Sequence, residues 1–136
     1  MQNNIILNKC EIIKRCLRSI RNNYSQSKDI FLTSCIHQDA AILNLERAAQ
    51  AAMDLAAHVV RKKYLGVPQK SAELFSLLEE HKIISHVIAE KMRHMVGFRN
   101  TAVHEYQELD MDIVVSVIEN NLTDFEMFMK EILAAK

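Results

Sequence analysis

The chain has 136 residues, of which 49% are hydrophobic and 25% charged, and its formal net charge is zero. This length suits one core, so we predict a single domain over residues 1–136. No segment approaches the roughly 20 apolar residues that span a bilayer, and the N-terminus lacks the basic start of a signal peptide, so we expect a cytoplasmic protein without a membrane segment. Zero net charge excludes nucleic-acid binding through bulk charge, so any such contact must be local.

Helices are favoured because the chain contains only two glycines and one proline. Sheets need frequent turns, whereas long helices with short connections need few such residues. In chain order, apolar spacing predicts helices over about residues 3–24 and 34–64, a short helix from Ser71, another from Ser85 and a last one from Asp110. Each of the last three starts at a residue type that caps helix N-termini well. Gly66 should cap the C-terminus of the second helix, and Pro68 should prevent its continuation.

Connected up and down, the long helices give an all-α fold, a four-helix bundle with one short additional helix. The three cysteines, Cys10, Cys16 and Cys35, lack the C-x-x-C spacing of zinc sites, so we expect them to be reduced. The histidines form no H-E-x-x-H or comparable ligand set. The sequence gives little support for a metal site and indicates no cofactor.

Charge is distributed unevenly along the chain. Residues 1–104 contain 15 basic and 9 acidic side chains, a balance of +6, whereas residues 105–136 contain 2 basic and 8 acidic ones, a balance of −6. One interpretation is complementary packing of an acidic last helix against basic earlier helices. The other is a basic face that binds phosphates.

Four polar side chains follow Gly97 closely: Arg99, Asn100, His104 and Tyr106. A helical glycine costs about 1 kcal/mol relative to alanine, so we expect Gly97 to mark a bend or the close approach of another backbone. On a straight helix Arg99 and Tyr106 share a face, and His104 lies about 140° from Arg99. Arg99 and His104 can meet if the helix bends, or with their copies across a two-fold axis. Taken singly, each side chain also has an ordinary explanation, such as an ion pair, a helix cap or a surface position.

Taken together, Arg99-Asn100-Thr101-Ala102-Val103-His104 resembles the signature of the HEPN superfamily, an arginine and a polar residue followed after a short spacer by a histidine. The continuation Glu105-Tyr106 is similar to the HepT-like branch, which has a tyrosine two residues after the histidine. Further features resemble that branch as well: Met95-Val96-Gly97-Phe98, Ala48-Ala49-Gln50 with Asp54 and His58, and the last helix from Asp110. The resemblance covers nearly the whole chain.

The resemblance implies a helical homodimer in which two Arg/His motifs line a cleft between subunits. Many members are metal-independent endoribonucleases and serve as the toxin of a toxin–antitoxin pair. Their partner is a minimal nucleotidyltransferase that attaches AMP to the motif tyrosine and silences the toxin. Arg99, Asn100 and His104 would then be catalytic, RNA would be the substrate, and Tyr106 would be the site of AMPylation.

The residue types suit this chemistry. Cleavage of RNA without a metal requires the 2′-hydroxyl to attack the adjacent phosphorus, and His104 can move the proton because imidazole titrates near neutral pH. Arg99 can hold the phosphate through two hydrogen bonds and stabilise the transition state. Asn100 can orient either group. AMP on Tyr106 would add bulk and a negative charge near Arg99.

A second polar group lies in the helix predicted over 34–64. Arg47, Gln50, Asp54 and His58 are spaced three, four and four residues apart, which places them on one stripe. Asp54 and His58 are one turn apart, within reach of a hydrogen bond. The stripe is either a structural polar network or the border of the cleft, where Arg47, Asp54 and His58 would support His104 or Arg99.

Two other functions compete with the ribonuclease hypothesis. The same dimer would also suit a non-catalytic module that binds a nucleotide or the nucleotidyltransferase, with Arg99 as a phosphate anchor. A purely structural bundle would require the cluster of Arg99, Asn100, His104 and Tyr106 to be accidental.

Overall fold

The computed structural model describes residues 2–24, 28–106 and 109–135, and these ranges contain helices but no strand. The helices are α1 (Gln2–Tyr24), α2 (Lys28–Thr33), α3 (Cys35–Lys62), α4 (Ser71–Glu80), α5 (His86–His104), α6 (Met111–Asn120) and α7 (Leu122–Ala134). The prediction of an all-α fold is confirmed. None of the described helices is long and apolar enough to cross a membrane.

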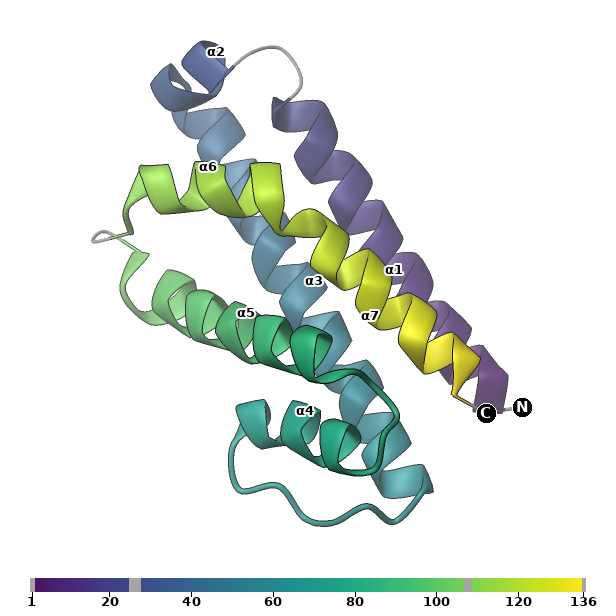
Figure 1. Cartoon of the computed structure of the whole chain (residues 1–136). Helices are drawn as coiled ribbons and strands as arrows, with labels where there is room; N and C mark the ends of the chain where they lie inside the picture. The colour runs from purple at the N-terminus through teal and green to yellow at the C-terminus, as the bar shows by residue number, and fades with distance from the viewer. Residues whose placement is uncertain (1, 25–27, 107–108, 136) are drawn as a thin grey trace.

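Four helices form a closed bundle. α1 contacts α3, α3 contacts α5, α5 contacts α7, and α7 returns to α1, while the short α4 packs against α3 and α5 (Figure 1). The two chain termini lie together at one end, and α6 begins at the opposite end of the α6–α7 segment (Figure 1). The observed architecture agrees with the predicted bundle and its additional helix.

The core combines small and large side chains. α3 buries a series of alanines that let neighbouring backbones come close: Ala41, Ala48, Ala49, Ala51, Ala52 and Ala56. Phe75 of α4 and Phe128 of α7 are fully buried and meet edge to face, with ring centroids 5.5 Å apart. Such aromatic pairs contribute about 0.5–1.5 kcal/mol beyond the area they bury.

Two of the three predicted N-caps are confirmed. The Ser85 hydroxyl accepts a hydrogen bond from the amide of Ile88, and the Asp110 carboxylate accepts one from the amide of Asp112. Ser71 is wrong as a cap, because it is the first residue of α4 and Lys70 stands at the cap position without a side-chain bond. An acid three residues beyond the cap position, Glu73, instead accepts from the amide of Gln69 at 2.7 Å.

Three local features differ from the predictions. α2 was not expected, because six residues are too few to show a helical period; it buries Phe31 against Tyr24. The last helix is divided at Asn121, a one-residue interruption that leaves the apolar stripe nearly in phase. α3 ends at Lys62, and Tyr64, with φ of 55°, takes the left-handed conformation expected of a C-cap glycine. Gly66 therefore lies beyond the cap.

The acidic last helix pairs with basic side chains of earlier helices. Both terminal guanidinium nitrogens of Arg21 in α1 donate to the carboxylate of Glu126 in α7, each at 3.0 Å. Lys91 of α5 lies 3.5 Å from the buried carboxylate of Asp124. These contacts support complementary packing as an explanation of the charge asymmetry.

Candidate active site

The Arg/His motif occupies the last two turns of α5. The helix continues through Gly97, which is exposed, and a Cβ built there would meet no atom within 4 Å. The expected close approach of another backbone is therefore wrong within the described chain. Thr101 donates its hydroxyl to the carbonyl of Gly97 at 3.2 Å. Because Gly97 has no Cβ, no side chain at this position covers the face of α5 on which Gly97 lies, next to the motif.

Arg99 is half-buried and incompletely paired. Its Nη1 donates to Oδ1 of the adjacent Asn100 at 3.4 Å. Its Nε is buried and has no hydrogen-bond partner among the described residues. An unpaired buried donor on a charged group is costly, so such a group in a native structure calls for an explanation. A bound anion would supply the missing acceptor.

His104 is exposed at the last position of α5, with Glu105 as the C-cap. Among the described residues, no hydrogen bond or ion pair joins His104 to Arg99. The helical period explains this separation, because five residues turn the helix by about 140° beyond a full turn. In one chain, the guanidinium of Arg99 and the imidazole of His104 therefore lie on different faces of α5.

Tyr106 lies beyond the end of α5 and does not continue the face of Arg99 as a longer helix would have required. Its hydroxyl donates a hydrogen bond to Oδ1 of Asp39 in α3. The hydrogen bond to Asp39 is the largest of the effects that raise the pKa of Tyr106 to about 12, followed by desolvation and the nearby negative charges of Asp39 and Glu46. Tyr106 remains 43% exposed, so reagents can reach it.

The sequence did not indicate the contact between Tyr106 and Asp39. Asp39 lies 67 residues before Tyr106, and the polar residues of α3 do not indicate which element packs beside them. Only the placement of Tyr106, just beyond the end of α5, beside the first half of α3 brings the two side chains together.

The polar stripe of α3 divides into separate contacts. Asp54 accepts from Nε2 of Gln50 at 2.9 Å and from Nζ of Lys9 in α1 at 3.3 Å. It does not bond to His58, contrary to the expected pair: Nε2 of His58 is buried without a partner among the described residues. Arg47 is exposed on the same helix.

His58 lies far from the motif within one chain. It lines a pocket of about 270 Å³ near the chain ends, with Ile6 of α1 and Ile132 of α7 among the other walls. Nineteen residues of helix separate it from Asp39, which corresponds to about 28 Å along α3. The supporting role of Arg47, Asp54 and His58 stays a prediction. Among the described residues of one chain, no hydrogen bond or ion pair joins Asp54 or His58 to Arg99 or His104.

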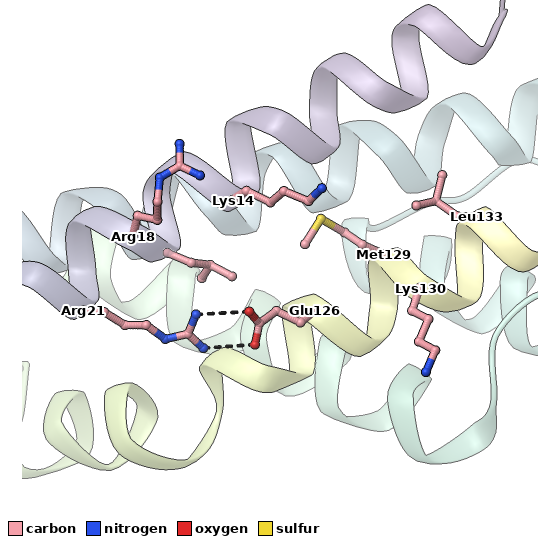
Figure 2. Close-up of a pocket in the computed structure, with 8 residues that line it drawn as sticks. Lys14, Arg18, Arg21, Glu126, Met129, Lys130 and Leu133 are labelled. Atoms are coloured by element: carbon pink, nitrogen blue, oxygen red, sulfur yellow. Dashed lines mark hydrogen bonds and ion pairs between the residues drawn. The ribbon is translucent and has the colours of Figure 1, made fainter.

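A groove between α1 and α7 concentrates basic side chains (Figure 2). Its volume is about 470 Å³, and the Arg21–Glu126 pair crosses it. Arg18 and Lys130 line the groove and make no ion pair with the described part of the chain. The interpretation of the uneven charge as a basic face that binds phosphates stays a prediction.

Comparison with known proteins identifies the chain. The model of the family described as ribonuclease HepT-like matches residues 13–132. The chain belongs to this family. Over 132 residues it is 43% identical to the mRNA nuclease HepT of Shewanella oneidensis, covering 97% of this chain and 98% of that protein. It is 28% identical over 128 residues to the tRNA nuclease HepT of Aphanizomenon flos-aquae, covering 94% and 87% of the two chains.

The fold of this HepT-like ribonuclease also matches a solved structure. A tri-AMPylated HEPN toxin of Shewanella oneidensis, in complex with its MNT antitoxin, superposes with a TM-score of 0.91 at 43% identity, covering 96% of this chain and 97% of that one. The family that the motif and the helical frame indicated is confirmed. No group of three or more His, Cys, Asp or Glu in the described ranges is arranged to hold a metal ion.

His58 should make stability depend on pH. Burial, and then the charges of Lys62 and Arg61, lower its pKa in the folded chain below the ordinary value of 6.5. As the pH falls through about 6.5, the unfolded chain binds a proton that the folded chain resists, so the free energy of unfolding decreases. Denaturant unfolding at about pH 7.5 and about pH 5.5 should show a smaller loss for His58→Leu than for the wild type. His94→Leu, at an exposed histidine, is the control, and equal losses in all three proteins would contradict the expectation.

Proposed function

We propose that this HepT-like ribonuclease is the toxin of a toxin–antitoxin pair, acts in the cytoplasm, and cleaves RNA without a metal ion through Arg99, Asn100 and His104. The observation that supports the site most strongly is the buried Nε of Arg99, which has no partner in the described chain. A guanidinium with an unused donor can bind a phosphate, because the phosphate oxygens supply the missing acceptor once the side chain turns to expose Nε.

The proposed step is an attack of the 2′-hydroxyl on the adjacent phosphorus. The new O–P bond forms as the bond to the 5′-oxygen of the next nucleotide breaks. His104 takes the proton of the 2′-hydroxyl or gives one to the leaving oxygen, for which its exposed position allows access. Arg99 stabilises the charge that develops on the phosphorane oxygens. Asn100, hydrogen-bonded to Arg99, orients that guanidinium.

A second copy of the chain completes the site in this proposal. Arg99 and His104 of one chain face different directions. The exposed Gly97, about two turns before His104 on the same face of α5, leaves room there for another backbone. In a homodimer with the two α5 helices at the two-fold axis, Arg99 of one chain lies opposite His104 of the partner subunit. The cleft between the subunits then holds the RNA.

The proposed antitoxin is a minimal nucleotidyltransferase that attaches AMP to Tyr106. The similar toxin of Shewanella oneidensis is tri-AMPylated and bound to an MNT antitoxin, which supports the assignment at 43% identity. The exposed hydroxyl of Tyr106 stands two residues from His104. AMP at this position adds bulk beside the cleft and a negative phosphodiester that competes for Arg99.

Removal of either motif side chain should abolish cleavage. We expect purified wild-type protein to cleave RNA in buffer that contains a chelator, and Arg99→Ala or His104→Ala to reduce the rate by about 10²- to 10⁴-fold, as for loss of a general acid–base or an oxyanion-stabilising group. The measurement is the cleavage rate of labelled RNA under single-turnover conditions.

Arg61→Ala and His81→Ala are the matched controls, because both side chains are exposed and lie on other helices or their ends. These variants should retain wild-type rates. RNA or nucleotide binding by the wild type without any turnover would contradict the ribonuclease assignment and support a non-catalytic binding module.

AMPylation should be confined to Tyr106. When the chain is coexpressed with its nucleotidyltransferase, intact-mass spectrometry should show one or more added AMP units, and Tyr106→Phe should show none. Tyr64→Phe is the control, since Tyr64 is 93% exposed and would be modified by an enzyme that simply selects accessible tyrosines. Modification that persists in Tyr106→Phe would contradict the assignment.

A further inference from the structure

The hydroxyl of Tyr106 has a defined partner that lies outside the segment from Arg99 to Tyr106. Asp39 lies on α3 and accepts the hydrogen bond of Tyr106 through Oδ1. Both side chains are exposed, so the pair stands at the protein surface, where an enzyme can reach it. A partner enzyme that approaches Tyr106 therefore meets a phenol and a carboxylate together.

We propose that Asp39 serves the AMPylation of Tyr106 by orienting its hydroxyl and by taking its proton when the oxygen attacks. The inference depends on the proposed modification of Tyr106. In the step, a bond forms between the phenolic oxygen and the α-phosphorus of a nucleoside triphosphate held by the nucleotidyltransferase. The bond from that phosphorus to its bridging oxygen breaks, and pyrophosphate leaves. The phenolic proton passes to Asp39, which is exposed and can release it to water.

Tyr106 needs a proton acceptor because its hydroxyl does not ionise by itself near neutral pH. With a pKa of about 12, roughly one molecule in 10⁵ carries the phenolate at pH 7. The same hydrogen bond that raises the pKa also points the proton at Asp39. Asp39 thus holds the tyrosine protonated until the triphosphate arrives and then removes the proton during attack, as a general base does.

The adenylylated tyrosine cannot keep the hydrogen bond to Asp39 that oriented its hydroxyl before the reaction. Once the oxygen is esterified, it has no hydrogen to donate to Asp39. The new phosphodiester also places a negative charge beside the carboxylates of Asp39 and Glu46, which already act on Tyr106 electrostatically. Like charges repel, so the adenylylated side chain is driven away from α3.

The test is the rate at which AMP is added to purified chain by its nucleotidyltransferase and ATP, followed by intact mass. Asp39→Asn keeps the shape and an accepting oxygen but cannot take the proton, and we expect a fall of about 100-fold. Glu46→Gln is the matched control on the same helix. It removes a nearby negative charge, but Glu46 makes no hydrogen bond to Tyr106 among the described residues, so the rate should stay close to wild type. An Asp39→Asn rate equal to or above wild type would overturn the proposal, because loss of negative charge alone favours an incoming triphosphate.

The dependence of the AMPylation rate on pH distinguishes a proton-accepting role of Asp39 from a purely structural one. Without Asp39, attack depends on prior ionisation of the phenol, so the rate of Asp39→Asn should rise about tenfold per pH unit, while the wild-type profile is flatter. The phenol of Tyr106, measured as the absorbance difference from Tyr106→Phe, should titrate at a lower pH in Asp39→Asn than in wild type, because the hydrogen bond to Asp39 raises its pKa. Matching profiles would contradict the role of Asp39.

The outcomes separate this inference from the proposed function. If the wild type gains no AMP at Tyr106, the proposed regulation fails and the role of Asp39 fails with it. If the wild type is modified at Tyr106 and Asp39→Asn is modified equally fast, only the role of Asp39 fails.

Discussion

The packing of α3 against its neighbours is the contact on which the other features depend. Half of its buried residues are alanines, and their small side chains let α1 and α5 approach along the same helix. Because α3 is held between them, the positions of its polar side chains are fixed. Asp39, exposed near the start of α3, accepts the hydrogen bond of Tyr106. His58, half-buried near the end of α3, lines a pocket near the chain termini.

The period of the α-helix then limits what one chain can do. A residue five positions further along is rotated by about 140°, so Arg99 and His104 cannot share a face of α5. The structure shows no contact between the two side chains in the described residues of one chain. Arg99 forms a hydrogen bond only to Asn100 among these residues, and His104 is exposed. This arrangement is consistent with a functional unit that contains two copies of α5, in which Arg99 of one copy acts with His104 of the other.

Features that repeat along the sequence were predictable, and features that depend on a single tertiary contact were not. The long amphipathic helices and the caps at Ser85 and Asp110 follow from apolar spacing and local hydrogen bonding. The division at Asn121 lasts one residue and leaves no periodic trace. The motif from Arg99 to His104 was visible because its members are neighbours in sequence. Asp39 was not, because only folding brings it to Tyr106.

The central claim, that the site needs Arg99 from one subunit and His104 of the partner subunit, can be tested with mixed dimers. Arg99→Ala and His104→Ala chains with different tags are coexpressed, and the mixed dimers are purified through both tags. One of the two composite sites then contains an intact Arg99 and an intact His104, so RNA cleavage should recover to roughly half of the wild-type rate. Mixed dimers as inactive as either variant alone would show that both side chains act within one chain and would contradict the account.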